Sequence, residues 1–325
     1  MNGKTIIQKV KTSSVVAITI LLIGIVVLFS FLSPQFLTGQ NIMNVLRQVS
    51  MIGIAGCGMI TVLLTGGIDL SLGAMVKFIN IVCATMMVTW GMHPIVACLL
   101  GVLIATALGT VNGFLISKFN LMPFITTLCM KFVLQGLSFI ITDSQPIYGL
   151  PEGFKVLGQG YVLGVPIPVI LMLILIVLTG IFLNRTYVGR YFYYLGGNEE
   201  ATKLSGVNTK LIRVLAYTLT GFFTGIAAIV WLSRVNSGQP ATGTDFEFDV
   251  ICGLVLGGVS ASGGEGGILG GLIGIVAIGF LNNGMTMINL SEYHQMVVKG
   301  LVLLLAIGMD SIKIMMRNKQ SKAKA

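Results

Sequence analysis

Apolar residues in this chain form ten long stretches, which are separated by short polar or glycine-rich gaps. The hydrocarbon core of a bilayer is about 30 Å thick, so a helix that crosses it needs roughly 20 mostly apolar residues. The eighth stretch is too short to cross as a regular helix and predicts a half-helix or re-entrant element. The predicted spans are Val15–Leu32, Val45–Leu64, Leu70–Trp90, Pro94–Ser117, Pro123–Thr142, Leu163–Leu183, Leu211–Ser233, Phe248–Gly258, Gly267–Ile288 and His294–Ile314.

The composition agrees with this pattern. Hydrophobic residues make up 55% of the chain and charged residues only 10%, which leaves too little polar surface to cover a soluble fold. The predicted fold class is therefore all-α: a polytopic transmembrane helical protein of about ten spans, with one or two broken or half-helices. All five cysteines lie inside apolar stretches and form no CxxC pair, so we predict neither a disulfide nor a metal site.

The formal net charge of +9 comes from basic residues at alternate gaps between the apolar stretches. Cytoplasmic loops carry an excess of Lys and Arg, which assigns these gaps and both termini to the cytoplasm. The basic residues form no stripe interleaved with aromatic residues, so no nucleic acid is expected as a partner. They include Lys4, Lys9 and Lys11, then Lys118, then Arg185, Arg190, Lys203, Lys210 and Arg213, and finally Lys313, Arg317, Lys319, Lys322 and Lys324.

Residues 1–325 are predicted to form a single transmembrane domain. Only two connections are long: a periplasmic loop at 143–162 and a basic cytoplasmic loop at 184–210. Long loops within compact domains usually carry function, so one loop on each side suggests a partner on each side.

Two glycine runs resemble one another weakly: Gly66–Gly73 and Gly257–Gly264. Each follows an apolar stretch, and their glycines and second serine superpose at a constant offset. Such runs break helices, and transporters place breaks at corresponding positions in two halves. The alternative is that these glycines only allow close helix packing.

The chain lacks the motifs of the common enzyme classes. No GxxxxGK[ST] phosphate-binding loop occurs, because the run Gly263–Gly267 has no following lysine or hydroxyl. His93 and His294 stand alone, which supports neither a zinc site nor a Ser-His-Asp arrangement. We therefore predict no catalytic residue, no metal ligand and no enzyme activity.

Charged residues inside membrane spans are costly unless they are paired or hydrated, and six candidates lie in or next to the predicted spans. Arg47, Asp249 and Lys299 lie close enough to span ends to extend their charges toward the interface. Lys77 and Lys131 lie deeper, and each is interpreted either as part of an interhelical pair or as the lining of a cavity. Asp69, eight residues before Lys77, would be too far away along a regular helix to pair with it directly.

Five motifs in a fixed order look familiar together. They are Gly66–Gly73 (GGIDLSLG), Asn112-Gly113 with Leu121–Leu128 (LMPFITTL), Gly189–Val207 (GRYFYYLGGNEEATKLSGV), Gly243–Ile251 followed by Gly257–Gly267, and Tyr293–Leu305. Through these motifs the chain resembles the permease subunits of ribose- and galactoside-type ABC importers. The resemblance extends from about Phe29 to Ile312.

This resemblance implies a bacterial inner-membrane permease that moves a monosaccharide inward. Two permease copies, identical or related, would form the pathway. A separate cytoplasmic ABC ATPase subunit would bind and hydrolyse ATP with Mg, and an extracytoplasmic sugar-binding protein would deliver the substrate. The chain itself would bind no cofactor.

The resemblance also places an ATPase-coupling helix between Arg190 and Val207. Ala201 and Leu204 would share one face of a short helix and could enter a groove on the partner, and Asn198 would cap its start with two glutamates in the first turn. The alternative is an ordinary solvated helix. The predicted coupling residues are Arg190, Asn198, Glu199, Glu200, Ala201, Leu204 and Gly206.

The predicted substrate-pathway residues come from the same motifs and from the charged positions in the spans. Lys77, Lys131 and Glu265 depart from the family pattern, and cationic linings could select an anionic or more polar ligand than a plain hexose. The two lysines could equally form pairs at a protomer interface. The pathway residues are Asp69, Ser71, Lys77, Asn112, Phe124, Lys131 and Ser260.

Two other functions stay open from the sequence. An ion-coupled secondary transporter would suit the membrane-embedded Asp69 and the broken helices. An ABC importer permease for nucleosides or another small polar solute would differ from the first interpretation only in its substrate.

Overall fold

The structure is a computed structural model that describes the backbone of residues 3–322 and the side chains of residues 15–308 and Ser311. Helices dominate it, and the only regular strands in the described part form one small hairpin. The elements are α1 (Gly3–Leu32), α2 (Gly39–Leu64), α3 (Leu72–Val88), α4 (Pro94–Phe119), α5 (Pro123–Thr142), η1 (Glu152–Phe154), α6 (Lys155–Gln159), β1 (Tyr161–Val162), β2 (Val165–Pro166), α7 (Ile167–Arg185), α8 (Tyr187–Gly197), α9 (Glu199–Leu204), α10 (Thr209–Val235), α11 (Phe246–Leu256), α12 (Ile268–Met287) and α13 (Glu292–Lys322).

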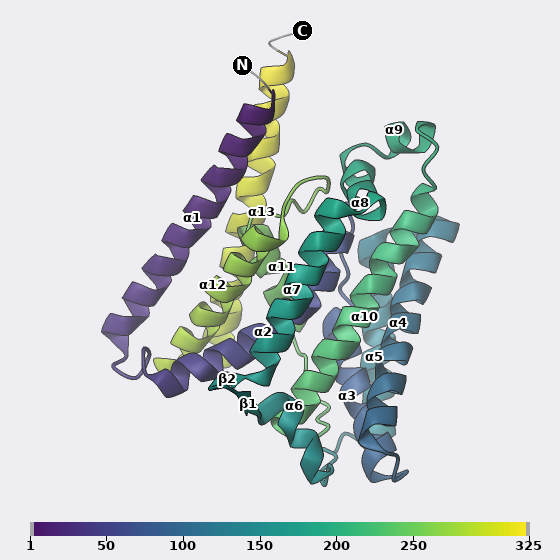
Figure 1. Ribbon diagram of the computed structural model, residues 1–325, viewed down its shortest axis with the longest axis vertical. Coiled ribbons are helices and arrows are strands. Elements are labelled where there is room, and N and C mark those ends of the chain that lie inside the picture. Colours follow the sequence, from purple (N-terminus) through teal and green to yellow (C-terminus); the bar gives the residue numbers. More distant parts are fainter. Residues whose placement is uncertain (1–2, 323–325) are drawn as a thin grey trace.

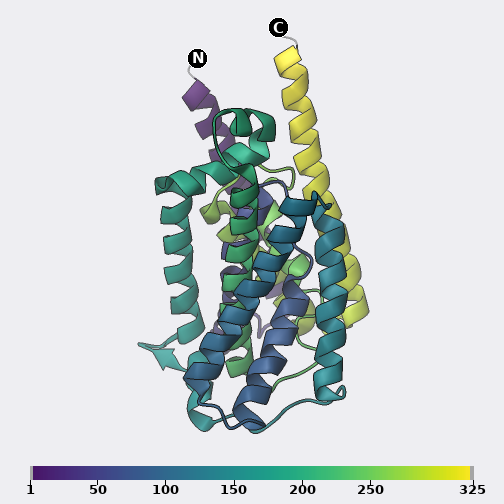
Figure 2. The ribbon, with the colours of Figure 1, turned by 90° about the vertical axis from the view of Figure 1, so that its right-hand side faces the viewer.

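Seven helices in the described part are long and apolar enough to cross a membrane, and α3 is a shorter apolar helix. The predicted half-helix is confirmed, because α11 has only 11 residues. Helix α1 begins, and α13 ends, at the end of the bundle that also carries α9 (Figures 1 and 2). The opposite end carries α6 and the β1–β2 hairpin (Figure 1). The chain is thus an all-α, polytopic membrane protein.

The core is built around α2 and α10. In the apolar window of α2, 83% of the residues are buried within the protein. Helices α4 and α10 approach closely through glycines: a Cβ at Gly113 would lie 2.8 Å from the Val214 Cα, and one at Gly225 would lie 3.0 Å from the Val102 Cα. Small residues at these positions let the two backbones pack directly, as is common between membrane helices.

Helix α1 lies at the edge of the bundle and packs on α12 (Figure 1). Only 11% of its Val15–Leu32 window is buried within the chain. Exposed apolar side chains cover the rest of this segment, such as Ile20 at 64% and Phe31 at 86% exposure. The outer surface of α1 is therefore suited to contact with lipid.

Two predicted span boundaries are wrong. The span predicted to start at Leu163 starts instead at Ile167, because Leu163 and Gly164 form the positive-φ turn of the β1–β2 hairpin. The second span begins at Gly39 and not at Val45, because the Thr38 hydroxyl accepts a hydrogen bond from the Asn41 N–H and caps the helix there.

Both glycine runs interrupt helices, as predicted. The first, Gly66–Gly73, contains the turn between α2 and α3, and the second lies between α11 and α12. Gly66 and Gly258, which the sequence comparison did not pair, both adopt positive φ, at 76° and 88°. These turns give the fold two short helices, α3 and α11, beside longer ones.

Candidate functional site

Three predicted pathway residues form one buried hydrogen-bond network at the start of α3. The Ser71 backbone N–H and hydroxyl both donate to Oδ1 of Asp69, over 2.9 Å and 2.6 Å. From α4, the Asn112 side-chain amide donates to the Ser71 Oγ over 2.9 Å. All three residues have no exposed surface. These hydrogen bonds attach the turn between α2 and α3 to helix α4, and none of the three side chains is open to solvent.

The same turn is also held by α5. The Leu70 N–H donates to the Thr127 hydroxyl over 3.1 Å, and that hydroxyl also lies 3.3 Å from the Ile68 carbonyl oxygen, to which it can donate. Thr127 is fully buried. The first glycine run therefore connects α2 to α3, and hydrogen bonds from α4 and α5 hold it in place.

Charged side chains from three helices meet next to this network. Lys131 on α5 forms an ion pair with Glu247 on α11, whose side chains are 22% and 1% exposed. Lys77 on α3 is 4% exposed, and its Nζ lies 5.1 Å from the centre of the Phe139 ring. Lys131 thus forms an interhelical pair, while Lys77 has a cation–π contact.

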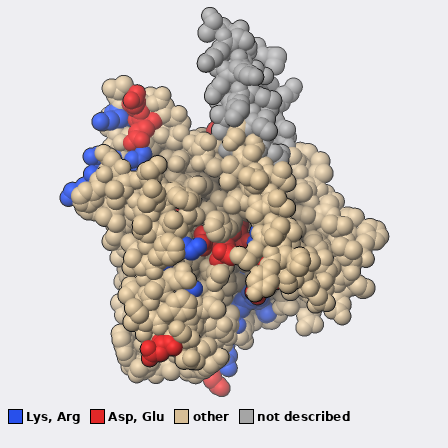
Figure 3. All heavy atoms as spheres, turned by 180° about the vertical axis from the view of Figure 1, so that it is seen from behind, with Lys and Arg blue, Asp and Glu red and all other residues tan. Residues whose placement is uncertain are grey.

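A second ion pair connects α11 to α13. The Lys299 Nζ lies 2.9 Å from Asp249 Oδ1, with 24% and 14% of the two side chains exposed. We expected these two charges to extend separately toward span ends, and this is wrong: each gains a partner, which lowers the cost of its burial. Acidic and basic side chains lie together in a hollow on the face of the protein shown in Figure 3.

The two acidic residues of α11 thus hold neighbouring helices on different sides. Sequence reasoning did not place Glu247 in the candidate site. The signal was available, because the Gly243–Ile251 motif contains both acids, but only the fold brings Lys131 and Lys299 to them. Half-helix α11 is tied to α5 through Glu247 and to α13 through Asp249.

The remaining two predicted pathway residues lie apart from this network. Phe124 is in the first turn of α5 and is 53% exposed. Ser260 is buried in the turn between α11 and α12, where its Oγ accepts a hydrogen bond from the Ser262 N–H over 3.2 Å. The structure therefore brings together five of the seven predicted residues.

The predicted coupling helix is present as α9, and its cap is confirmed. The Asn198 side-chain oxygen accepts a hydrogen bond from the Ala201 N–H over 2.9 Å, and Glu199 pairs with Arg213 of α10 at 2.7 Å. Thr202 is buried against the protein, whereas Leu204 is 89% exposed. Ala201 and Glu200 are also exposed, and Gly206 ends the segment at a φ of 84°. An exposed leucine on a helix whose start is fixed in place is available to a partner.

Helix α8, which sequence reasoning missed, connects α9 to the membrane helices. Helix α8 is rich in aromatic residues, but it is amphipathic. Phe192 and Leu195 are buried, while Arg190 is exposed and its Cζ lies 4.8 Å from the centre of the Tyr187 ring. The Tyr193 hydroxyl donates to the Gly266 carbonyl oxygen over 3.3 Å. Burial raises the pKa of the Tyr193 phenol, so it stays a hydrogen-bond donor at neutral pH.

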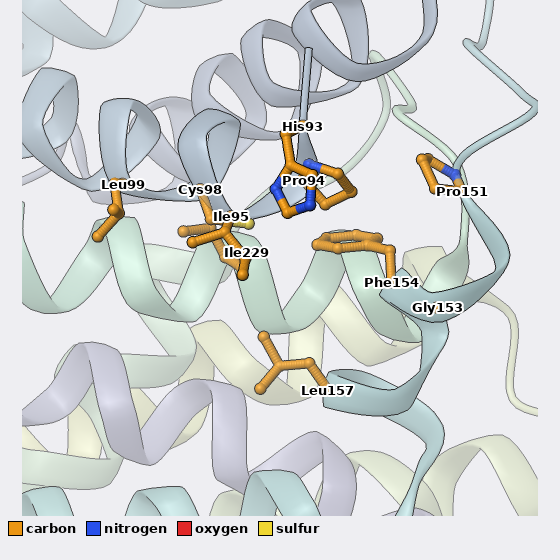
Figure 4. A pocket seen from close by; sticks show the side chains of 10 residues that line it. All are labelled: His93, Pro94, Ile95, Cys98, Leu99, Pro151, Gly153, Phe154, Leu157 and Ile229. Carbon is orange, nitrogen blue, oxygen red and sulfur yellow. The ribbon is translucent and has the colours of Figure 1, made fainter. Parts of the chain in front are cut away.

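An apolar pocket of about 460 Å³ lies at the other end of the bundle, between the start of α4 and the η1–α6 segment (Figure 4). His93 is its one side chain with hydrogen-bonding nitrogens, and Phe154 and Leu157 cover it from the loop. A sugar requires several polar partners, which this lining does not offer. Within the described residues, no group of three His, Cys, Asp or Glu side chains is placed to hold a metal ion.

Comparisons with known proteins agree with this arrangement. Residues 41–307 match the family described as branched-chain amino acid transport system / permease component. The ribose import permease of Bacillus subtilis is 43% identical over 89% of this chain and 90% of its own. The ribose import permease of Escherichia coli K12 is 40% identical over 90% and 92%, and the D-allose transport system permease of the same strain is 34% identical over 89% of each chain. No solved structure matches the chain.

Proposed function

The chain belongs to the permease family of binding-protein-dependent ABC importers, and from this premise we propose that it is the membrane pathway subunit for one monosaccharide. It is a multi-pass protein of the bacterial inner membrane. Its named relatives import ribose, allose and arabinose, so we expect a pentose or hexose as substrate. The single observation that carries the proposal is this similarity, which extends over about nine-tenths of each chain.

The importer also needs a separate ATPase, because the chain lacks a phosphate-binding loop of its own. Membership of the family adds an extracytoplasmic binding protein to the proposal. The exposed Leu204 on α9 supports an ATPase-docking role for Arg190, Asn198, Glu199, Glu200, Ala201, Leu204 and Gly206. ATP and Mg would be bound and hydrolysed by that partner. The proposal includes about ten spans, with one or two broken or half-helices, both termini and α9 in the cytoplasm, and a second permease copy.

The pathway in this proposal runs along the face where α3, α5, α11 and α13 meet. Lys131, Lys299 and Asp249 are each partly exposed there, which gives a polar strip in an otherwise apolar surface. Charged groups within spans usually line a water-filled path or pair inside the bundle. Lys77 and Lys131 would offer donors to sugar hydroxyls, and the network of Asp69, Ser71 and Asn112 would hold the adjacent turn.

Reconstitution tests the function. Proteoliposomes that contain this chain and its ATPase are supplied with the binding protein and with one labelled sugar at a time. ATP is added inside or outside the vesicles. We expect uptake only with the ATPase, its ATP and the binding protein present. Uptake driven by a proton or sodium gradient without the ATPase would contradict the proposal and support a secondary transporter, and uptake of a nucleoside alone would correct the substrate class.

A further inference from the structure

Three backbone segments meet beneath the coupling loop with no side chains between them. They are the turn after α2, the end of α8, and the glycine-rich connection between α11 and α12. The Gly264 N–H donates to the Leu64 carbonyl oxygen over 2.9 Å, and Gly196 of α8 packs against both groups. We call this contact of Gly66, Gly196, Gly263 and Gly264 the glycine junction.

The space at the junction admits only glycine at Gly196. An added Cβ there would overlap the Leu64 carbonyl oxygen, and it would lie 2.6 Å from the Gly264 nitrogen and 3.0 Å from the Gly263 Cα. The backbone of α8 therefore touches two other backbones directly. The neighbouring Gly197 is different, because a Cβ there would meet no atom within 4 Å.

The other two segments are equally close to each other. A Cβ on Gly263 would lie 2.7 Å from the Gly66 nitrogen and 3.0 Å from the Gly196 Cα. Gly263 and Gly66 also adopt positive φ, at 91° and 76°, which glycine tolerates best. The two runs that resemble each other in sequence are thus in contact in space, with the end of α8 against them.

Each segment leads to a different functional region. The turn at Gly66 continues into α3, which carries Lys77, and the second run follows α11, which carries Glu247 and Asp249. Helix α8 continues through Asn198 into α9, the exposed helix of the coupling loop. The junction is therefore where the coupling loop meets both broken helices.

We propose that Gly196 is a coupling residue, through which movement of α8 and α9 shifts the starts of α3 and α12 and the end of α11. Contact between backbones passes a displacement on directly, whereas contacting side chains can absorb it by changing rotamer. The Tyr193 hydrogen bond to Gly266 adds a second link between α8 and the same connection. This inference rests on the proposed function, because it needs an ATPase that acts on α9.

Gly196→Ala tests the inference, with Gly197→Ala as its matched control. Both substitutions add one methyl group to adjacent positions of α8, but only the first displaces the junction. In proteoliposomes with the ATPase and the binding protein, we expect Gly196→Ala to keep ATP hydrolysis within about twofold of the unchanged protein and to lose at least tenfold of sugar uptake. Gly197→Ala should transport like the unchanged protein.

Correct assembly is checked by size-exclusion chromatography of each variant with the ATPase. An assembled Gly196→Ala importer that transports as fast as Gly197→Ala would overturn the inference. If Gly196→Ala does not assemble, Tyr193→Phe is the deciding variant, because it removes only a hydroxyl. A lower ratio of sugar moved to ATP hydrolysed would support the inference. An unchanged ratio would overturn it. If the unchanged protein itself shows no ATP-driven uptake, the proposed function fails instead.

Discussion

Glu247 is one of the most deeply buried charged side chains in the described bundle. Its side chain is 1% exposed, one oxygen pairs with Lys131, and the other, Oε2, accepts no hydrogen bond in the described part of the chain. A Cβ on Gly73 would overlap that second oxygen, so only glycine leaves room for the carboxylate. A buried charge that loses its partner is strongly destabilising, whereas replacing both partners by neutral groups costs less.

This gives a prediction for the pair. Lys131→Met should destabilise the protein by about 3 kcal/mol, because Glu247 would be left charged and unpaired in the membrane. The double variant Lys131→Met/Glu247→Gln should recover a large part of that loss. Thermal unfolding of the purified variants in detergent, analysed as a double-mutant cycle, measures the coupling.

Lys118→Met is the control for this cycle, since Lys118 is exposed and lies over two aromatic rings at the end of α4. Its effect should be small. Equal losses in the single and double variants would show that Glu247 and Lys131 are not energetically coupled.

Lys77 gives a separate prediction about transport. It is buried and its Nζ lies over the Phe139 ring without forming an ion pair in the described part of the chain, so Lys77→Gln should leave the fold intact while removing a cationic donor next to the pathway. If Lys77 lines the path, uptake of the sugar should fall about tenfold, the equivalent of one lost charge-assisted hydrogen bond. Unchanged uptake rates and unchanged competition by anionic sugars would remove Lys77 from the pathway.

At the scale of the elements, α9 shows how a very short helix is made available to a partner. The Asn198 cap and the Glu199–Arg213 pair fix its position, so it loses little conformational freedom on binding.

Leu204→Ser should lower the affinity for the ATPase by about tenfold or more, because burying a leucine contributes roughly 1.5–3 kcal/mol. Binding of the purified ATPase to the permease in nanodiscs measures this change.

Lys203→Ser is the matched control, because Lys203 is exposed on the same helix and its charge contributes little to a solvated contact. An equal loss of affinity in the two variants would mean that the apolar contact is not what α9 provides.

The elements also show which features a sequence alone can reveal. Apolar length predicted α4 and α5 closely, and the Asn198 cap and the half-length of α11 were visible as local patterns. The start of α7 was missed because Leu163 is apolar yet lies at a hairpin tip. Ion pairs such as Lys299–Asp249 were missed because they depend on which helices become neighbours, and local periodicity does not determine that.

For the whole molecule, the opposite ends of the bundle give a direct test of orientation. Leu163, at the hairpin tip, is fully exposed, and Leu204, on α9, is 89% exposed. In a variant whose five native cysteines are replaced, Leu163→Cys should react with a membrane-impermeant maleimide in whole spheroplasts. Leu204→Cys should react only after the membrane is permeabilised. The reverse pattern would place α9 outside and contradict ATPase coupling.

The position of α1 has a consequence for biosynthesis. Helix α1 leaves the ribosome before α12, yet within the chain it packs mainly on α12. At roughly 5–20 residues per second, on the order of ten seconds or more separates the synthesis of Leu32 from that of Ile268. During that interval α1 must be held by lipid or by the insertion machinery. Its Val15–Leu32 segment is strongly apolar and uncharged, so it can remain in lipid before α12 is made.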